Sequence, residues 1–423
     1  MLASPLRLAR RAAPALLAAG FLSAGLLSAA HAQPAPRATG STAAAKPTIA
    51  KPSAAGFDAF LRELWRDAAA RGVSRATFDA ALSGVTPNPR ILALTKKQAE
   101  FVRPIWSYLD GAVAGSRVEQ GRRLAAANGQ LLDRIERAYG VPRGVVLAVW
   151  GIETSYGAAT GGEDVIRSLA TLAHARFRDD FFRNELLVAL TILERGDVAA
   201  RAMRGSWAGA MGHTQFMPSS YEKWAVDGDG DGRRDIWNSV PDALASTANY
   251  LAEHGWNRGF SWGYEVRLPE NFRFGERTRS METWARAGLA RADGERLPVG
   301  VQGTLFLPAG HKGPAFLLTS NFETIKAYNT SESYALAVGH LADRIAGGGA
   351  IEGEWPRGER ILTLAEGRDL QTRLRAKGLF EGKIDGKLGA ASREGIRLYQ
   401  QREGLIPDGY ATPALLARIR GGG

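Results

Sequence analysis

Cysteine is absent from this chain of 423 residues, and its absence excludes several kinds of site. The protein can form no disulfide, no thiolate metal centre, no cysteine nucleophile and no cysteine-linked lipid anchor. After the first 32 residues, the sequence also lacks any apolar run long enough to span a membrane. A bound metal ion must therefore have oxygen or histidine ligands.

Positive charge exceeds negative charge, since 54 Lys and Arg residues stand against 43 Asp and Glu residues, for a net charge of +11. This balance favours an anionic partner, and nucleic acid, membrane headgroups and acidic cell-wall polymers would all satisfy it. Hydrophobic residues make up 45% of the chain, which excludes disorder over most of its length. At roughly 150 residues per domain, the length predicts two or three domains.

The N-terminus has the pattern of a secretory signal sequence. Three arginines within the first eleven residues precede an apolar stretch at 12–30, which is followed by His31 and Ala32. We interpret residues 1–32 as a cleavable signal. The alternative is a short membrane anchor, but the stretch is rich in alanine and shorter than a typical span. Residues 33–55 are rich in Pro, Ala, Thr, Ser and Lys, which predicts a flexible linker.

Helical periodicity dominates residues 56–346, the main body of the chain. Apolar residues recur at i, i+3 and i+4 spacing, as in Phe57, Phe60 and Leu61. Shorter, mixed patterns between residues 263 and 318 predict some strand. The expected fold class is mainly α, with helices over 57–68, 131–139, 143–153, 180–194, 241–254 and 331–345.

A second, smaller module follows the main body. Residues 347–360 open with three glycines and are poor in apolar residues, so we place a linker there. Residues 361–420 contain an imperfect repeat, in which a Gly-Leu pair leads to an Asp-Gly turn and then to a helix. By itself, this pattern predicts a small helical domain.

Glu153, near the end of a predicted helix, is a candidate for acid catalysis. Val146, Val149 and Trp150 precede it by seven, four and three residues, so they share its helix face and place its carboxyl against apolar surface. Such desolvation raises a carboxyl pKa and keeps a proton available for donation. The polar, glycine-containing stretch 154–157 ends the helix and would put Glu153 at the edge of a cleft. The alternative is a structural carboxylate paired with an arginine.

The segment 205–221 offers groups suited to a sugar ligand. Small residues at 208, 209, 210 and 212 allow close approach to the backbone, while Ser206 and Gln215 supply a hydroxyl and an amide for sugar hydroxyls and N-acetyl groups. Five of the ten tryptophans fall between residues 207 and 262, and aromatic rings beside polar groups suit a carbohydrate cleft. Core packing is the alternative role for each tryptophan.

The acidic stretch 227–235 follows the spacing of an EF-hand calcium loop, with carboxylates at loop positions 1, 3, 5 and 9 and glycine at position 6. Position 12, which usually holds a bidentate glutamate, is Asn238. A plain acidic turn is the alternative. The candidate metal ligands are Asp227, Asp229, Asp231, Arg233 through its carbonyl oxygen, and Asp242, which lies just downstream.

Three motifs resemble the lytic murein transglycosylase B family. They are GIETSYG at 151–157, which contains Glu153, GAMG at 209–212, and QFMPSS at 215–220. The resemblance covers roughly residues 57–346 and implies a lysozyme-like helical domain in which Glu153 is the sole acid and base. The module beyond the linker resembles peptidoglycan-binding domains of type 1, which implies that it anchors the protein to the cell wall.

The resemblance also implies the substrate site. The residues it places there are Ser206, Gln215, Tyr250, Tyr328 and Asn329. His213 and Thr214 lie at positions that we expect to vary in the family, so we assign them no role. Glu163 and Asp164 are candidates for a second carboxylate, although solvated loop charges are their simpler interpretation. The acidic loop is similar to the single calcium loop of this family, where the ion is structural.

The implied function is that of a lytic murein transglycosylase, a carbon–oxygen lyase that cleaves the MurNAc-GlcNAc β-1,4 bond of peptidoglycan and leaves 1,6-anhydro-MurNAc ends. No cofactor is required for this chemistry, and a structural Ca²⁺ is expected. The partners are peptidoglycan glycan strands, with other cell-wall enzymes as candidates, and neither nucleic acid nor a membrane anchor is expected. The chain should be soluble in the periplasm. A lysozyme-type hydrolase and a non-catalytic wall-binding protein remain as alternatives.

Overall fold

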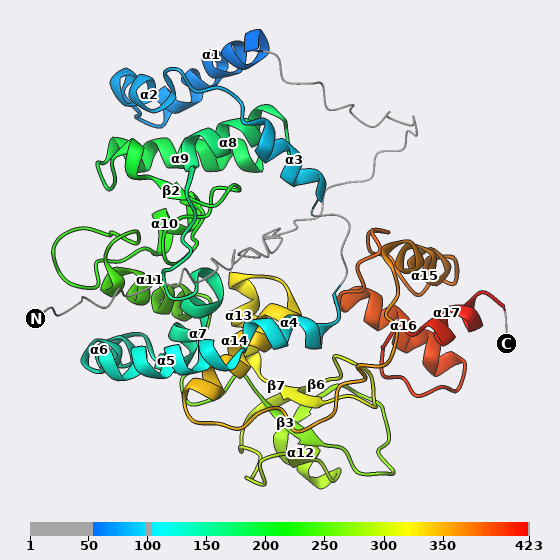
Figure 1. The fold of residues 1–423 in the computed structure, drawn as a ribbon. Helices are drawn as coiled ribbons and strands as arrows, with labels where there is room; N and C mark the ends of the chain where they lie inside the picture. The colour runs from blue at the N-terminus through cyan, green and yellow to red at the C-terminus, as the bar shows by residue number, and fades with distance from the viewer. Residues whose placement is uncertain (1–53, 98–102, 422–423) are drawn as a thin grey trace, which may run out of the picture.

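The structure, a computed structural model, describes residues 54–97 and 103–421 of the chain. The predicted signal sequence, 1–32, and nearly all of the predicted linker, 33–55, lie outside the described residues. None of the helices in the described ranges has the length and apolar content that a membrane span requires. Helices make up most of the regular structure (Figure 1), which confirms the prediction of a mainly α fold.

The first helices pack on a pair from the middle of the chain. Ser74 caps α2 by accepting a hydrogen bond from the Thr77 amide, and its own amide and hydroxyl each donate to the Glu194 carboxylate at 2.9 Å. These bonds join α2 to α9. The elements of this layer, in the upper part of Figure 1, are α1 (Ala54–Ala70), α2 (Arg75–Leu82), α3 (Pro89–Lys97), α8 (Val165–His174) and α9 (Phe181–Glu194).

The helix α7 (Arg143–Thr154) forms the centre of the main body, and every residue from 144 to 151 is buried. Among the other elements, α14 (Glu332–Ile345) packs most extensively against α7. A Cβ on Gly144 would lie 2.9 Å from the Ala342 carbonyl oxygen, so this close approach requires glycine. The other helices around this pair are α4 (Ile105–Ala112), α5 (Gly115–Ala127), α6 (Gly129–Tyr139), α11 (Val240–Glu253) and α13 (Ser320–Tyr328), while α10 (Pro218–Trp224) packs against α9 and α11.

A five-stranded antiparallel sheet lies beside the helices and has its own apolar core. Trp284, in α12 (Met281–Arg286), is buried there and donates its indole N–H to the Gly303 carbonyl at 2.8 Å. The strand order is β4-β6-β7-β3-β5. The strands are β3 (Gly263–Arg267), β4 (Thr278–Ser280), β5 (Ala290–Arg291), β6 (Gln302–Phe306) and β7 (Ala315–Leu318); a separate two-stranded ribbon pairs β1 (Glu163–Asp164) with β2 (Arg204–Gly205).

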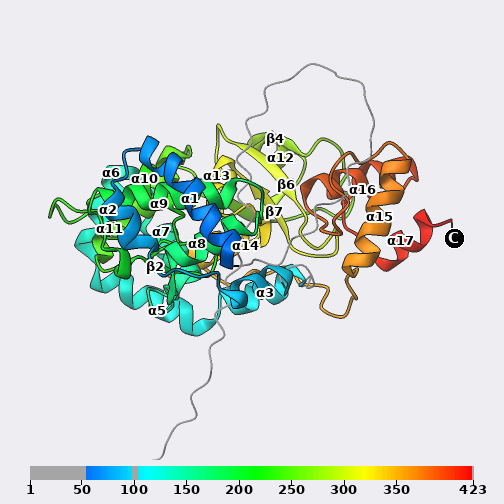
Figure 2. The same cartoon turned by 90° about the horizontal axis from the view of Figure 1, so that it is seen from above.

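The C-terminal module consists of α15 (Leu364–Ala376), α16 (Ala390–Arg402) and α17 (Pro413–Ile419) around a small separate core. Its sequence repeat has a physical basis. The amide oxygens of Gln371 and Gln400, both buried, each accept a hydrogen bond at 2.8 Å from the glycine of an Asp-Gly turn, Gly386 and Gly409. Seen from above, the module lies beyond the sheet, at one end of the molecule (Figure 2).

The segment 347–360, predicted as a linker, lies against the main body. Trp355 packs against Trp106 of α4, with ring centroids 6.1 Å apart. Arg357 forms two hydrogen bonds with the Asp110 carboxylate, at 2.7 and 2.9 Å. The module itself contacts the main body through a hydrogen bond between His311 and Asp408 and an ion pair between Glu332 and Arg393. These contacts restrict how far the module can move from the helical body.

Candidate active site and metal loop

The chain turns sharply where α7 ends, directly after Glu153 and Thr154. Ser155, Tyr156 and Gly157 all have left-handed backbone, with φ of 50°, 59° and 87°. The amides of Ser155 and Tyr156 donate to carbonyl groups in the last turn of α7 and so close the helix end. Left-handed backbone at two consecutive non-glycine residues costs about 1–3 kcal/mol each and persists only where the surrounding contacts enforce it.

The Glu153 carboxyl is half-buried at this turn. Burial raises its pKa from 4.5 to about 7, and the Tyr334 hydroxyl on α14 offsets part of that rise by interacting with the carboxyl. The Tyr334 hydroxyl is buried and has no partner of standard hydrogen-bond geometry among the described residues, so the carboxyl is the polar group that it meets. Near neutral pH, a large fraction of Glu153 therefore carries a proton.

Two further tyrosines of the predicted site lie in this region, and their hydroxyls are bonded to the backbone. Tyr328 donates to the Thr214 carbonyl at 2.6 Å, and Tyr250 donates to the Ala327 carbonyl at 2.7 Å. The Phe216 ring packs against both, with its centroid 5.5 Å from Tyr250 and 5.8 Å from Tyr328. The segment that carries Phe216 is thereby fixed against α11 and α13.

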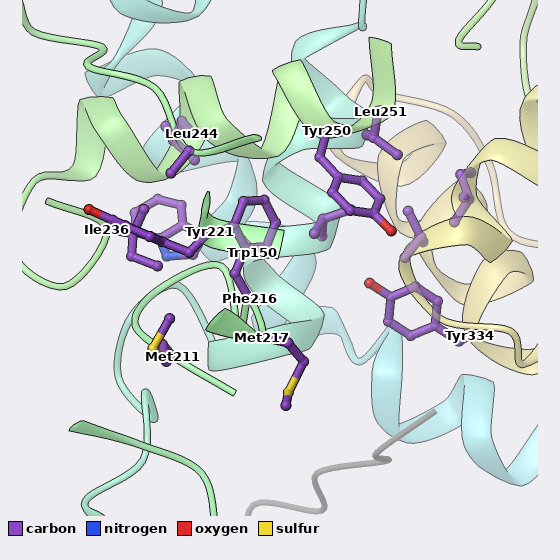
Figure 3. Close-up of a cluster of buried hydrophobic side chains, with 14 of the residues drawn as sticks. Trp150, Met211, Phe216, Met217, Tyr221, Ile236, Leu244, Tyr250, Leu251 and Tyr334 are labelled. Atoms are coloured by element: carbon purple, nitrogen blue, oxygen red, sulfur yellow. The ribbon is translucent and has the colours of Figure 1, made fainter. Parts of the chain in front are cut away.

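The charge of Glu153 affects the pKa of two neighbouring tyrosines. Burial, and to a smaller extent the Glu153 charge, raises the pKa of both Tyr328 and Tyr334, so both hydroxyls stay protonated. Figure 3 shows the hydroxyls of Tyr250 and Tyr334 directed into the same space from opposite sides. Asn329, which follows Tyr328, is buried, and its side-chain oxygen accepts from the Ser331 amide at 3.1 Å.

Ser206 is buried in a tight turn. Its hydroxyl oxygen accepts from the amides of Ala208 at 3.3 Å and Ala210 at 3.1 Å, and its own amide donates to the Ala210 carbonyl at 2.7 Å. Gly209 has φ of 86°, and a Cβ there would lie 2.4 Å from Leu169. The turn therefore requires glycine at 209, and the Ser206 hydroxyl can still donate its proton.

Gln215 combines an unusual backbone with an unpaired side-chain atom. Its φ is 52°, and its amide nitrogen donates to the carbonyls of Thr160 and Gly212, each at 2.9 Å. Its amide oxygen is buried and has no hydrogen-bond partner among the described residues. A buried acceptor without a partner is costly, and a ligand that donates a hydrogen bond would satisfy it.

The two candidates for a second carboxylate have local structural roles. Asp164 caps α8 by accepting from the Arg167 amide at 2.9 Å. Glu163 lies in β1, 3.7 Å from the Arg90 guanidinium. Neither is needed to explain the pKa of Glu153, which follows from burial and from Tyr334.

Tyr334 is the neighbour of Glu153 that sequence analysis missed. It lies in the first turn of α14 and is followed by a run of buried apolar residues, a pattern typical of a core aromatic. Its position opposite Glu153 depends on how α14 packs along α7. No local pattern carries that information, since the two residues are far apart in the sequence.

The acidic loop brings together Asp227, Asp229 and Asp242, whose carboxylate oxygens lie within 4.8 Å of one another. Asp242, in the first turn of α11, is buried and accepts from the amides of Gly228 at 2.8 Å and Asp235 at 2.6 Å. Burial, and then the charge of Asp229, raises the pKa of Asp242. A cation would relieve this repulsion, and such oxygens are the ligands that Ca²⁺ prefers.

Two of the predicted metal ligands lie outside this group of three. The Asp231 carboxylate is exposed and accepts a hydrogen bond from the Arg233 amide at 2.8 Å. Arg233 is exposed as well. Gly230 and Gly232 have φ of 83° and 86°, the left-handed backbone for which the loop needs glycine. Of the predicted carboxylate ligands, Asp227, Asp229 and Asp242 therefore lie together, and Asp231 is not in that group.

Two family models match the chain. Residues 56–343, more than half of the chain, match the family described as a transglycosylase SLT domain, and residues 365–419 match a family of peptidoglycan binding domains. Membrane-bound lytic murein transglycosylase B of Escherichia coli (strain K12) is 36% identical over 224 residues. That match covers 51% of this chain and 60% of the relative, less than two thirds of its length.

Solved structures extend the similarity. SltB3 from Pseudomonas aeruginosa, in complex with NAG-anhNAM-pentapeptide, is 47% identical with a TM-score of 0.81, and the match covers 86% of this chain and 99% of that one. Escherichia coli Slt35, in complex with calcium, is 30% identical with a TM-score of 0.58, and the match covers 69% of this chain and 92% of that one.

Proposed function

The chain belongs to the transglycosylase SLT domain family, and from this premise we propose that it is a lytic transglycosylase of peptidoglycan. It cleaves the β-1,4 bond between MurNAc and GlcNAc and leaves a 1,6-anhydro-MurNAc end. The single observation that carries this proposal is the half-buried Glu153 carboxyl, whose pKa of about 7 suits both proton donation and proton uptake. The complex of the similar SltB3 with NAG-anhNAM-pentapeptide supports the identity of the product.

In the first step, Glu153 donates its proton to the glycosidic oxygen. Protonation makes the departing GlcNAc a better leaving group, and the carbonyl oxygen of the MurNAc 2-acetamido group bonds to MurNAc C1 as the bond from C1 to the glycosidic oxygen breaks. The substrate thus supplies the stabilisation that a second carboxylate gives in many glycosidases. This agrees with the structural roles of Glu163 and Asp164.

In the second step, the Glu153 carboxylate takes the proton of the MurNAc C6 hydroxyl. The C6 oxygen attacks C1, closes the 1,6-anhydro ring and displaces the acetamido oxygen, so water is not consumed. The carboxyl ends the cycle protonated. One group with a pKa near neutrality can therefore serve as acid and then as base.

We assign the substrate contacts to groups that still have hydrogen-bonding capacity. The unpaired amide oxygen of Gln215 would accept from a sugar hydroxyl or an N-acetyl N–H. The Ser206 hydroxyl would donate to an N-acetyl carbonyl. Tyr250, Tyr328 and Asn329 would form the wall of the site, since the hydroxyls of both tyrosines already hold backbone carbonyl groups.

The acidic loop would bind Ca²⁺ in a structural role, through Asp227, Asp229 and Asp242. The calcium complex of the similar Slt35 supports this assignment. The carboxylate set, the buried position of Asp242 and its raised pKa all favour a cation there. The reaction itself uses no cofactor, because Glu153 supplies both proton transfers.

We further propose the domain organisation and location predicted from the sequence. Residues 1–32 would direct export to the periplasm, 56–346 would form the catalytic domain, and 361–420 would hold the enzyme on the wall after the segment 347–360. The match of the C-terminal residues to peptidoglycan binding domains supports the wall-binding role.

The test is the release of soluble muropeptides from purified sacculi by the wild-type protein and by Glu153→Gln. The amide has almost the shape of the carboxyl but cannot donate its proton, so activity should fall by about 10²- to 10⁴-fold or more. Wild-type turnover by the variant would overturn the role of Glu153. An inactive wild type that still binds sacculi would favour the wall-binding alternative.

A further inference from the structure

His213 lies between the end of α7 and the metal loop, and three hydrogen bonds hold it there. The Trp150 indole N–H donates to His213 Nδ1 at 2.9 Å, and the Thr154 hydroxyl lies 3.2 Å from both the His213 and the Trp150 carbonyl oxygens, which share its proton. The His213 amide donates to the Ile236 carbonyl at 2.9 Å. Because an indole nitrogen can only donate, Nδ1 must be an acceptor, and the imidazole is neutral with its proton on Nε2.

The imidazole also packs on the turn that follows Glu153. A Cβ added to Gly157 would lie 2.3 Å from His213 Cε1 and 2.6 Å from Nδ1, so the ring rests directly on the glycine backbone. The Gly157 amide donates to the Thr154 hydroxyl oxygen at 3.0 Å. Thr154 and His213 therefore hold both sides of the left-handed turn that begins two residues after Glu153.

The two residues after His213 also form hydrogen bonds to neighbouring segments. The Thr214 carbonyl accepts from the Tyr328 hydroxyl at 2.6 Å, and the Gln215 amide nitrogen donates to the Thr160 carbonyl at 2.9 Å. The segment 212–215 thus links the helix that carries Glu153, the turn after it, and α13. A shift of this segment would move the Gln215 amide oxygen relative to the Glu153 carboxyl.

We propose that His213 is a positioning residue for the reaction: its neutral imidazole, bonded to Trp150, fixes the distance between the Glu153 carboxyl and the Gln215 amide. This proposal rests on the proposed function of the site. Trp150 precedes Glu153 by three residues on α7, so the bond acts within one helical turn of the carboxyl. The Thr154 bond to the His213 carbonyl acts one residue beyond it.

Loss of the hydrogen bond between Trp150 and His213 should lower kcat. Loss of the acceptor at His213 leaves the Trp150 N–H unpaired in a buried position, and the turn can relax away from the segment 212–215. Displacement of an acid by about 1 Å can cost up to about 100-fold in rate. Because Gln215 keeps its own hydrogen bonds to the Thr160 and Gly212 carbonyls, the displacement should fall mainly on the acid, and KM should change much less than kcat.

The experiment compares His213→Leu with His213→Asn on a soluble peptidoglycan glycan strand, with each kcat corrected for the folded fraction at the assay temperature. Leucine has a similar size but no acceptor, whereas the asparagine oxygen can take the place of Nδ1. His213→Leu should lose about 10- to 100-fold in kcat, and His213→Asn should recover most of that loss. The control is His174→Leu, at a half-buried histidine that packs against Phe57 and Phe60, which should keep wild-type kcat and KM.

A second comparison adds Trp150→Phe, which removes the donor. The double variant with His213→Leu should be no slower than the slower single variant, because both remove one bond. Equal losses for His213→Leu and His213→Asn, or a wild-type kcat for His213→Leu, would overturn the proposal. An inactive wild-type protein would instead overturn the proposed function, and nitrogen NMR of the imidazole would then decide: a protonated Nδ1 at neutral pH contradicts the Trp150 bond.

Discussion

Replacing Glu153 by glutamine should stabilise the protein at alkaline pH, in addition to abolishing the reaction. Burial raises the pKa of this carboxyl from 4.5 to about 7 in the folded protein. The stability that the Glu153 carboxyl contributes to the fold is therefore fully present below about pH 4.5, its unfolded pKa, and is lost as the pH rises through about 7, its folded pKa. At 1.36 kcal/mol per pKa unit, the ionised carboxylate costs the wild type about 3 kcal/mol above that range. The amide carries no charge and avoids this cost.

The assay is a pair of thermal unfolding series, near pH 4.5 and near pH 8.5, on the wild type and on Glu153→Gln. The two proteins should unfold at similar temperatures at the lower pH, and the variant should be several degrees more stable at the higher pH. Glu163→Gln serves as the matched control and should show no alkaline gain, since its carboxyl lies in the two-stranded ribbon beside Arg90. A difference in unfolding temperature between wild type and Glu153→Gln that is the same at both pH values would show that burial does not raise the pKa of Glu153.

Three further predictions concern Tyr334, the acidic loop and the C-terminal module. Tyr334→Phe removes the hydroxyl that lowers the pKa of Glu153, so the alkaline limb of the pH–rate profile should move to higher pH; an unmoved limb would show that the hydroxyl has no such effect. Calcium added after chelator treatment should stabilise the protein by about 2.7 kcal/mol at a hundredfold excess over Kd, and magnesium should stabilise it much less. Asp242→Asn should remove the stabilisation by calcium. A wild-type protein whose melting temperature does not change with calcium would make a plain acidic turn the better interpretation. Deleting residues 361–420 should reduce retention on insoluble sacculi while largely preserving cleavage of soluble strands, and equal retention would remove the anchoring role.

Six helices of the main body could be predicted closely because their signals are local, whereas others, such as α5 and α8, were not predicted. The pattern over 143–153 corresponds to α7, observed from Arg143 to Thr154, and the pattern over 331–345 corresponds to α14, which begins after the capping residue Ser331. The sheet could be predicted only as some strand between 263 and 318. Its order, β4-β6-β7-β3-β5, is set by pairings between distant segments, and β5 has two residues, too few for a periodic pattern.

In the candidate site, too, local sequence patterns indicate some residues, whereas the packing of distant elements brings in others. The apolar face that precedes Glu153 indicates its environment within a single helix, so its raised pKa could be anticipated. Tyr334 and His213 act on it across elements, and their residue types alone point equally to core packing. In the acidic loop, EF-hand spacing favours Asp231, which lies outside the group of three carboxylates, whereas Asp242, predicted as a downstream ligand, lies within that group.

The proposed role of Glu153 is to promote closure of an anhydro ring and not to activate water. The most direct measurement is mass spectrometry of the muropeptides released from purified sacculi in water enriched in heavy oxygen. The MurNAc ends should weigh one water less than a reducing end and should carry no heavy oxygen. Reducing ends that contain heavy oxygen would contradict this role and would make the protein a lysozyme-type hydrolase.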